Sequence, residues 1–245
     1  MKFRTLALAL LAVAATAPSA SAQTPTPTPA PASTATPPPS AKESKETPAQ
    51  ASAATPAASK SNYPALVERV RKGDRAVDFG ELRMAYTETA DYNPYGGGEE
   101  RGQMFAALNE RKFADALSVA EKVLQKNYVD LNAHFVSSVA NRELGRGEQA
   151  DFHRFIFTGL ADSIRRSGDG KSTSTAFVVI STAEEYVVLN LMGLRPAGQA
   201  LLHDGGHSYD RMRGVDPQTN QQVELYFNID KPFGWLGNSL KKDKP

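Results

Sequence analysis

Helical periodicity between Phe105 and Ser167 is the feature that most constrains the fold of this chain. Apolar residues recur there at the three- and four-residue intervals of helices that bury one face. Turn-forming residues interrupt the pattern at 127–130 and 145–147, so consecutive helices should fold back as antiparallel hairpins. The periodic apolar residues are Phe113, Ala116, Leu117, Ala120, Val123, Leu124, Leu131, Phe135, Val139, Phe152, Phe155, Ile156, Leu160 and Ile164.

Bulky and small residues are spaced in a definite order along these hairpins. Phe113 is followed by Ala116 and Ala120, and Leu144 precedes Gly145 at a later turn. The order is similar to that of the tetratricopeptide repeat, which places bulky and small packing residues at such positions. About two units are present, whereas a free-standing solenoid needs three or more. The hairpins are therefore expected to pack against other parts of the domain.

The C-terminal part of the sequence changes to a period of two. Val223, Leu225 and Phe227 alternate with Glu224, Tyr226 and Asn228, a pattern that is typical of a half-buried strand. Turn signals at residues 204–206 and 216–220 divide the segment. Three strands of an antiparallel meander are expected, at residues 198–204, 207–215 and 221–229.

The region between the hairpins and the meander predicts two further elements. Residues 177–180, Phe-Val-Val-Ile, are a candidate for a short buried strand. Ser181 and Glu184 have the spacing of a capping box, which opens a short helix. We therefore predict an α+β fold in which antiparallel, tetratricopeptide-like helical hairpins precede a small antiparallel β-meander with a short helix. The predicted single domain spans residues 62–245, with a helical part (62–167) and a small sheet part (168–245).

The N-terminus has the pattern of a signal peptide over residues 1–22. Lys2 and Arg4 precede an apolar run, and small residues at 19–22 offer a cleavage site. The apolar run is too short to span a bilayer well, so a retained anchor helix is the weaker alternative. The sequence predicts a periplasmic or secreted protein with no transmembrane segment after cleavage.

Residues 23–61 are rich in proline, alanine and threonine and contain almost no bulky apolar residues. Such a segment cannot offset the entropy of ordering, so we expect a disordered linker with polyproline II character. A tether that holds the domain away from a surface and a passive leader both remain open, and composition favours the leader.

Composition excludes several classes of site. The chain has no cysteine, so disulfides, thiolate metal clusters and thiol nucleophiles are excluded. Its formal net charge of +1 supplies no field for nucleic acid, and no nucleic-acid partner is expected. No motif for a cofactor is present, and we predict none.

The stretch from Leu202 to Asp210 holds the densest set of chemically versatile side chains. If its diglycine closes a hairpin, the two histidines should lie on neighbouring strands and face each other. Two imidazoles and a carboxylate suit zinc or a similar metal. Aspartate and glycine are also what a tight turn requires, and this simpler interpretation is favoured while metal binding stays open. The candidate ligand-binding residues here are His203, Asp204, His207, Tyr209 and Asp210.

Other candidates carry weaker signals. Ser208 beside these histidines suggests a hydrolase, but the nucleophile-elbow pattern Gly-x-Ser-x-Gly is absent. Tyr92 and Tyr95 lie in a proline- and glycine-containing loop, where they are expected either to contact a ligand or to fix the loop to the core. His134 and His153 are expected to be core histidines. Glu184 and its neighbour Glu185 would form an acid/base pair, but capping already accounts for one of them.

Several short motifs together are similar to those of the bacterial domain-of-unknown-function family 4919. The resemblance spans residues 63–240 and implies a bacterial protein that is usually exported, with no activity or catalytic residue to carry over. The motifs are Tyr92-Asn93-Pro94-Tyr95, Lys126-Asn127-Tyr128-Val129-Asp130, Ser167-Gly168-Asp169-Gly170-Lys171-Ser172, Asp204-Gly205-Gly206-His207-Ser208-Tyr209-Asp210 and Tyr226-Phe227-Asn228-Ile229-Asp230-Lys231-Pro232-Phe233-Gly234.

These observations favour a non-enzymatic binding or assembly module of the cell envelope, with a protein or another envelope component as partner. The alternative is a metal-dependent or hydrolytic enzyme that uses residues 203–210. The sequence assigns no catalytic residue and leaves both hypotheses open.

Overall fold

The computed structural model describes residues 61–242, which form eight α-helices, a 3-10 helix and a four-stranded sheet. The predicted α+β class is confirmed. The predicted signal peptide, and all of the predicted linker except Ser61, lie outside the described residues. In chain order the elements are α1 (Tyr63–Arg71), α2 (Phe79–Tyr86), α3 (Gly98–Asn109), α4 (Phe113–Lys126), α5 (Leu131–Glu143), α6 (Gly147–Ser167), η1 (Thr173–Thr175), β1 (Phe177–Val178), α7 (Thr182–Leu191), β2 (Arg195–Asp204), β3 (His207–Val215), β4 (Gln222–Asn228) and α8 (Asp230–Lys242).

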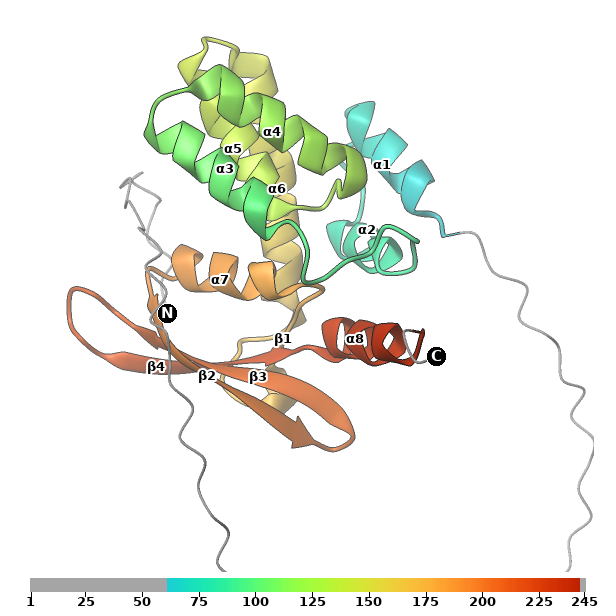
Figure 1. Cartoon of the computed structure of the whole chain (residues 1–245), viewed down its shortest axis with the longest axis vertical. Helices are drawn as coiled ribbons and strands as arrows, with labels where there is room; N and C mark the ends of the chain where they lie inside the picture. Colours follow the sequence, from blue (N-terminus) through green and yellow to red (C-terminus); the bar gives the residue numbers. More distant parts are fainter. Residues whose placement is uncertain (1–60, 243–245) are drawn as a thin grey trace, which may run out of the picture. The chain divides into compact units, whose positions relative to one another are not determined.

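Helices α3 to α6 form the predicted hairpins. Each packs against the next in the chain, and Figure 1 shows them gathered at one end of the domain. Asp130 begins α5 by accepting a hydrogen bond from the Ala133 N–H at 2.9 Å, which satisfies one of the free donors of the first turn. Gly145 separates α5 from α6 with a φ of +74°, a conformation that glycine adopts without steric cost. Whether these hairpins are related to tetratricopeptide repeats stays a prediction.

Helix α2 crosses α6 at very close range. A Cβ atom placed on Gly159 of α6 would lie 2.3 Å from the ring of Phe79 in α2. The missing side chain therefore lets the aromatic ring reach the helix backbone. Phe79 also packs edge-to-face on Phe155, with ring centroids 5.5 Å apart.

The three predicted strands form an antiparallel meander. β2 pairs with β3 around the Gly205–Gly206 turn, where both glycines have positive φ, and β3 pairs with β4. This combination matches the two-residue turns that fit the twist of a hairpin. The expected strand bounds differ from those observed by no more than three residues.

The sheet is not purely antiparallel, and that part of the prediction is wrong. β1 adds to the outer edge of β4 in a parallel orientation, which gives the order β1-β4-β3-β2. Phe177 of β1 packs against Phe227 of β4, with ring centroids 5.7 Å apart. The apolar run at residues 177–180 predicted the strand, but nothing local to it specified which strand it would join.

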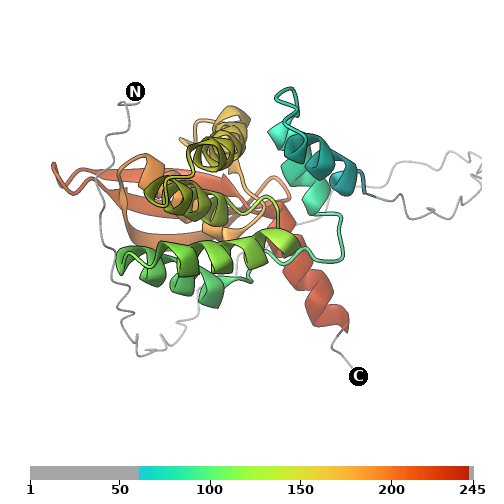
Figure 2. The same ribbon diagram turned by 90° about the horizontal axis from the view of Figure 1, so that it is seen from above.

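Helix α7 lies between the hairpins and the sheet, contacting α5 and β2 (Figure 1). Seen from above in Figure 2, the strands run beneath the helices, and α8 extends away from the end of the sheet. No helix within residues 61–242 combines the length and apolar character needed to cross a membrane.

A fully buried ion pair joins these layers. Arg83 of α2 donates from Nε and Nη2 to the two oxygens of Glu184 in α7, at 2.9 and 2.6 Å, and also to Ser163 and Val178. Glu184 accepts the Ile180 N–H as well. The predicted capping box is therefore only half correct, because Glu184 reaches back to the backbone while the Ser181 hydroxyl caps nothing.

Candidate functional site

Two buried carboxyl groups meet between α7 and the sheet. The Glu185 side chain is wholly buried and Asp210 on β3 is 5 % exposed. The Gln199 amide of β2 donates to Asp210 at 2.6 Å. Neither carboxyl oxygen of Glu185 has a hydrogen-bond partner among the described residues. A buried carboxyl group without a partner is far more stable in its neutral form, so Glu185 holds a proton.

The electrostatics identify which carboxyl carries that proton. Burial is the main reason that the pKa of Glu185 rises to about 9, and the negative charge of Asp210 acts in the same direction. Burial also raises the pKa of Asp210, while the hydrogen bond from Gln199 opposes that rise. At neutral pH Glu185 is therefore the neutral member of the pair.

The geometry of α7 explains why two adjacent glutamates behave differently. Consecutive helical residues point about 100° apart. Glu184 faces α2, where Arg83 neutralises it, and Glu185 faces the sheet, where Asp210 repels its ionised form. The same residue type is thus a structural anion at one position and a buried acid at the next.

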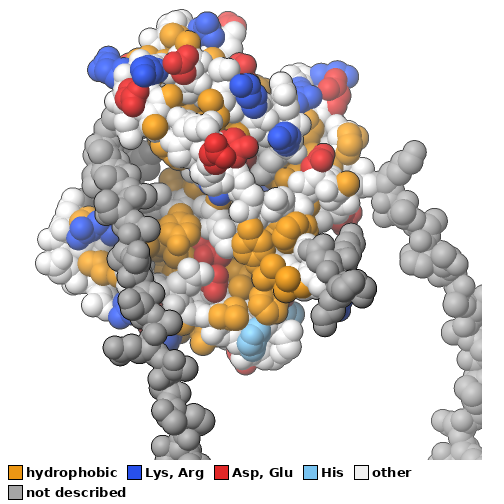
Figure 3. Space-filling model, viewed as in Figure 1, with side chains coloured by type: hydrophobic (Ala, Val, Ile, Leu, Met, Phe, Trp, Pro, Cys, Tyr) orange, Lys and Arg blue, Asp and Glu red, His pale blue; other side chains and the backbone are white. Residues whose placement is uncertain are grey.

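Exposed apolar side chains surround this carboxyl pair. Tyr95 is 41 % exposed, Tyr186 44 %, Leu201 50 % and Phe233 38 %. We call these four residues, together with Trp235, the apolar rim. Figure 3 shows acidic atoms in a hollow bordered by apolar side chains on the face that it displays.

Sheet register, ring contacts and position in α7 relate the rim residues to the pair. Leu201 stands directly opposite Asp210 in the sheet register. Burial raises the pKa of the Tyr95 hydroxyl, and the nearby carboxyl groups of Asp210 and Glu185 raise it further. The Tyr95 ring packs on Trp235, with ring centroids 6.0 Å apart. Tyr186 follows Glu185 in α7, and Phe233 reaches the same sheet face through His203, with ring centroids 5.5 Å apart.

The expectation that His203 and His207 face each other is wrong. His203 pairs with Ser208, whereas His207 pairs with Asp204, and alternation along a strand sends neighbouring side chains to opposite faces. His203 Nδ1 lies 3.2 Å from the Ser208 hydroxyl. His207 Nδ1 lies 2.6 Å from a carboxylate oxygen of Asp230, at the start of α8.

The remaining predicted residues serve the fold. Asp204 accepts a hydrogen bond from Thr173 at 2.7 Å, and Tyr209 is buried on the sheet face opposite Asp210. The Tyr92 hydroxyl donates to the Ile180 carbonyl at 2.7 Å, which fixes its loop to the core. Of the seven candidates, the structure brings Tyr95 and Asp210 together, with His203 on the same sheet face. Within residues 61–242, no three His, Cys, Asp or Glu side chains are placed to hold a metal ion.

Comparison with protein families identifies the chain. Residues 51–235 match the model of the family described as Domain of unknown function (DUF4919). This protein belongs to the DUF4919 family. The match covers most of the chain and confirms the resemblance seen in its motifs. No curated protein and no solved structure matches it.

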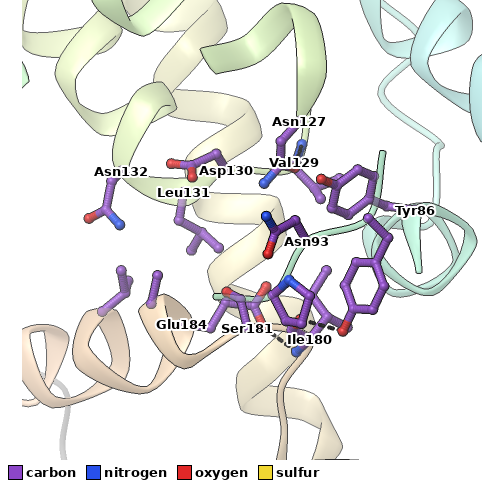
Figure 4. Close-up of a pocket in the computed structure, with 14 residues that line it drawn as sticks. Tyr86, Asn93, Asn127, Val129, Asp130, Leu131, Asn132, Ile180, Ser181 and Glu184 are labelled. Carbon is purple, nitrogen blue, oxygen red and sulfur yellow. Dashed lines mark hydrogen bonds between the residues drawn. The ribbon is translucent and has the colours of Figure 1, made fainter. Parts of the chain in front are cut away.

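This DUF4919 member also has a small pocket between the loop of Asn93, the loop before α5 and the start of α7 (Figure 4). Asn93 projects between the loop before α5 and the start of α7. Asp130 is engaged as the cap of α5, and its pKa is raised by burial. The acidic groups at this junction already have partners in the fold. The lining residues are Tyr86, Tyr92, Asn93, Pro94, Asn127, Val129, Asp130, Leu131, Asn132, Ile180, Ser181, Ala183, Glu184 and Val187.

The two core histidines of this DUF4919 member form a neutral pair, which confirms the prediction of satisfied rings. His134 Nε2 donates to the Tyr128 carbonyl at 2.8 Å, so its Nδ1 accepts from His153 Nδ1 at 3.0 Å. Burial lowers the pKa of His134 to about 3 and that of His153 to about 4.

Sequence reasoning raised Glu185 only as the partner of Glu184 in an acid/base pair and did not keep it as a site residue, although a signal was present. Glu185 stands three and four residues before Val188 and Leu189, which are both buried in α7. A charged residue in register with an apolar stripe is unusual, because an unpaired carboxylate is rarely buried. Gln199 and Tyr186 carried no comparable signal, because exposed polar residues and single exposed aromatics are common on protein surfaces.

Proposed function

We propose that this DUF4919 protein is a non-enzymatic binding or assembly module of the cell envelope, and that it holds a protein partner on the apolar rim. The observation that supports this proposal is the group of exposed aromatic and aliphatic side chains around the recessed pair of Glu185 and Asp210. Exposed apolar side chains that gather on one face of a protein are typical of interaction sites. Tyrosine and tryptophan are also over-represented among the residues that dominate binding energy. Export to the periplasm or medium is part of the proposal and rests on residues 1–22.

A hydrolase is the second candidate because one specific contact favours it. Ser208 and His203 lie 3.2 Å apart, within the range of a nucleophile and a general base in an unliganded site. Among the described residues no carboxylate orients the His203 ring, so the third member of a triad is not supplied. Ser208→Ala tests this candidate, since it would abolish hydrolysis of any ester substrate that the purified protein turns over.

Position-selective photo-crosslinking in the intact cell envelope tests the binding proposal. A photoreactive phenylalanine analogue replaces Tyr186 or Leu201 of the rim in separate variants. The control carries the same group at Leu144, which is 37 % exposed at the end of α5 and belongs to the hairpin part. We expect one defined protein adduct from both rim positions and none of that size from Leu144. Equal labelling at all three positions, or none at the rim, would contradict the proposed surface.

A further inference from the structure

The polar groups at the centre of the rim are two carboxyl groups and one amide. The Gln199 amide nitrogen already donates to Asp210. Both oxygens of the buried Glu185 carboxyl lack a hydrogen-bond partner among the described residues. A ligand that enters from the rim therefore has to bring its own donors, and a positive charge is the best complement to Asp210.

The rim around this acceptor is apolar on several sides. Tyr95 and Trp235 come from a loop and α8, Tyr186 comes from α7, and Leu201 comes from β2. A lysine or arginine side chain fits such surroundings, because its methylene stem packs on apolar surface while its head pairs with a carboxylate. Aromatic faces also attract these cations.

Resting on the proposed function, we propose that Asp210 and Glu185 receive a lysine or arginine side chain of the partner, whose flanking apolar residues cover the rim, and that the proton of Glu185 leaves on binding. The O–H bond of Glu185 breaks and its proton passes to solvent. The N–H groups of the ligand then donate to the two carboxylates in its place. One positive charge enters the recess as one proton departs, so the buried charge does not change.

The groups that face Glu185 allow this exchange. Glu184 is neutralised by Arg83 at 2.6 Å and keeps that partner throughout. Tyr95 is neutral at physiological pH, since burial raises the pKa of its hydroxyl. Among the described groups that influence Glu185, Asp210 is then the carboxylate that can accept hydrogen bonds from a ligand. Proton release should therefore number at most one per ligand bound.

Trp235 gives the experiment a built-in reporter, because it is the one tryptophan of the chain and it packs on Tyr95. Its fluorescence is followed as the full chain is titrated with the capped tripeptide leucyl-lysyl-leucine. The control peptide replaces lysine with norleucine, which keeps the stem and removes the charge. We expect the lysine peptide to bind at least tenfold more tightly than the control. Asp210→Asn should remove that difference, and urea unfolding of the variant verifies that it is folded.

The pH dependence separates proton release from simple charge attraction. Up to one proton released per ligand makes binding of the lysine peptide up to tenfold tighter for each pH unit between pH 6 and 8. Glu185→Gln should bind the peptide with a flat pH profile, because its amide has no proton to release. A flat profile in the unaltered protein would overturn the exchange.

The outcomes distinguish this inference from the function on which it rests. If the norleucine peptide binds as well as the lysine peptide, or if neither binds, the proposal that the ligand is a basic side chain is wrong. The proposal that the rim is a binding surface then still holds if crosslinking from Tyr186 and Leu201 gives the selective adduct. Preferential binding of chitotriose would replace the peptide with a carbohydrate and overturn the inference. Loss of the selective adduct would overturn the binding function itself.

Discussion

Glutamine in place of Glu185 is expected to stabilise this protein at neutral pH. The native state holds a proton on this carboxyl, with a pKa of about 9 against an ordinary value of 4.5. Between those two values the native state binds one more proton than the unfolded state, so stability falls as pH rises through the window. Neutral pH lies about 2.5 units above the ordinary value, and each unit corresponds to about 1.4 kcal/mol. The carboxyl therefore costs at most about 3–4 kcal/mol at pH 7, and its amide isostere avoids that cost.

Urea unfolding followed by circular dichroism measures this effect at several pH values. We expect Glu185→Gln to be more stable by about 1–3 kcal/mol at pH 7, since relaxation around the site reduces the full value. The advantage should grow between pH 5 and pH 8 and nearly vanish below pH 4.5, where the unfolded state is protonated as well. A variant that is less stable at pH 7, or a difference that does not change with pH, would refute the assignment of the proton.

The neighbouring Glu184 provides a matched control on the same helix. Glu184→Gln breaks the buried ion pair with Arg83, and an uncompensated buried guanidinium destabilises a fold by about 3–5 kcal/mol. The same chemical change one residue apart should therefore have opposite signs. Destabilisation by both substitutions would mean that Glu185 is an ionised, paired carboxylate.

Three further predictions concern the fold. Gly159→Ala should destabilise the protein by about 1–3 kcal/mol in urea unfolding, because its Cβ would lie 2.3 Å from the Phe79 ring. Burial lowers the pKa values of His134 and His153 to about 3 and about 4, so stability should fall below pH 6.5 by up to about 1.4 kcal/mol per pH unit for each histidine. Tyr92→Phe should cost about 1 kcal/mol of unfolding free energy, since it removes a buried hydrogen bond.

Each of these predictions has a control in the same chain. Gly102→Ala lies in α3 with no atom near its Cβ and should be neutral or stabilising by up to about 1 kcal/mol. Glutamine at both histidine positions should flatten the acid limb of the pH profile, and an unchanged slope would contradict the neutral pair. Tyr95→Phe, on the exposed rim, should leave stability within about 0.5 kcal/mol of the original protein.

Local patterns predicted most of the fold. The helical stripe from Phe113 to Ile164 gave the hairpins because a buried helix face repeats every three or four residues. The alternation at 223–229 and the diglycine at 205–206 gave the meander, since both signals lie within a few residues of the structure they specify. The partner of β1 was not predicted, because the chain between Val178 and β4 contains three other elements and no local pattern specifies that pairing.

The site was harder to predict because it depends on pairing register. One residue of register decides whether His203 meets His207 or Ser208, and the observed Asp204–His207 pair sends the histidines to opposite faces. The same register brings Gln199 and Leu201 to the face of Asp210. The aspartate and histidine residues next to the diglycine turn pointed to the part of the sheet that contains Asp210. Its partner Glu185 lies on α7, and no local pattern predicts how this helix packs on the sheet.

Glu184 and Glu185 contribute differently to the stability of the fold. Glu184 satisfies Arg83 and the Ile180 N–H, so the fold loses stability without it. Neither oxygen of Glu185 has a hydrogen-bond partner among the described residues, and at neutral pH the carboxyl lowers stability because the native state has to keep a proton on it. Folding therefore does not account for a carboxyl group at this position. A ligand that displaces the proton of Glu185 would explain why a buried acid lies beside exposed aromatic side chains. Glu185→Gln should therefore show two effects together: a higher free energy of unfolding at neutral pH and a flat pH profile of ligand binding.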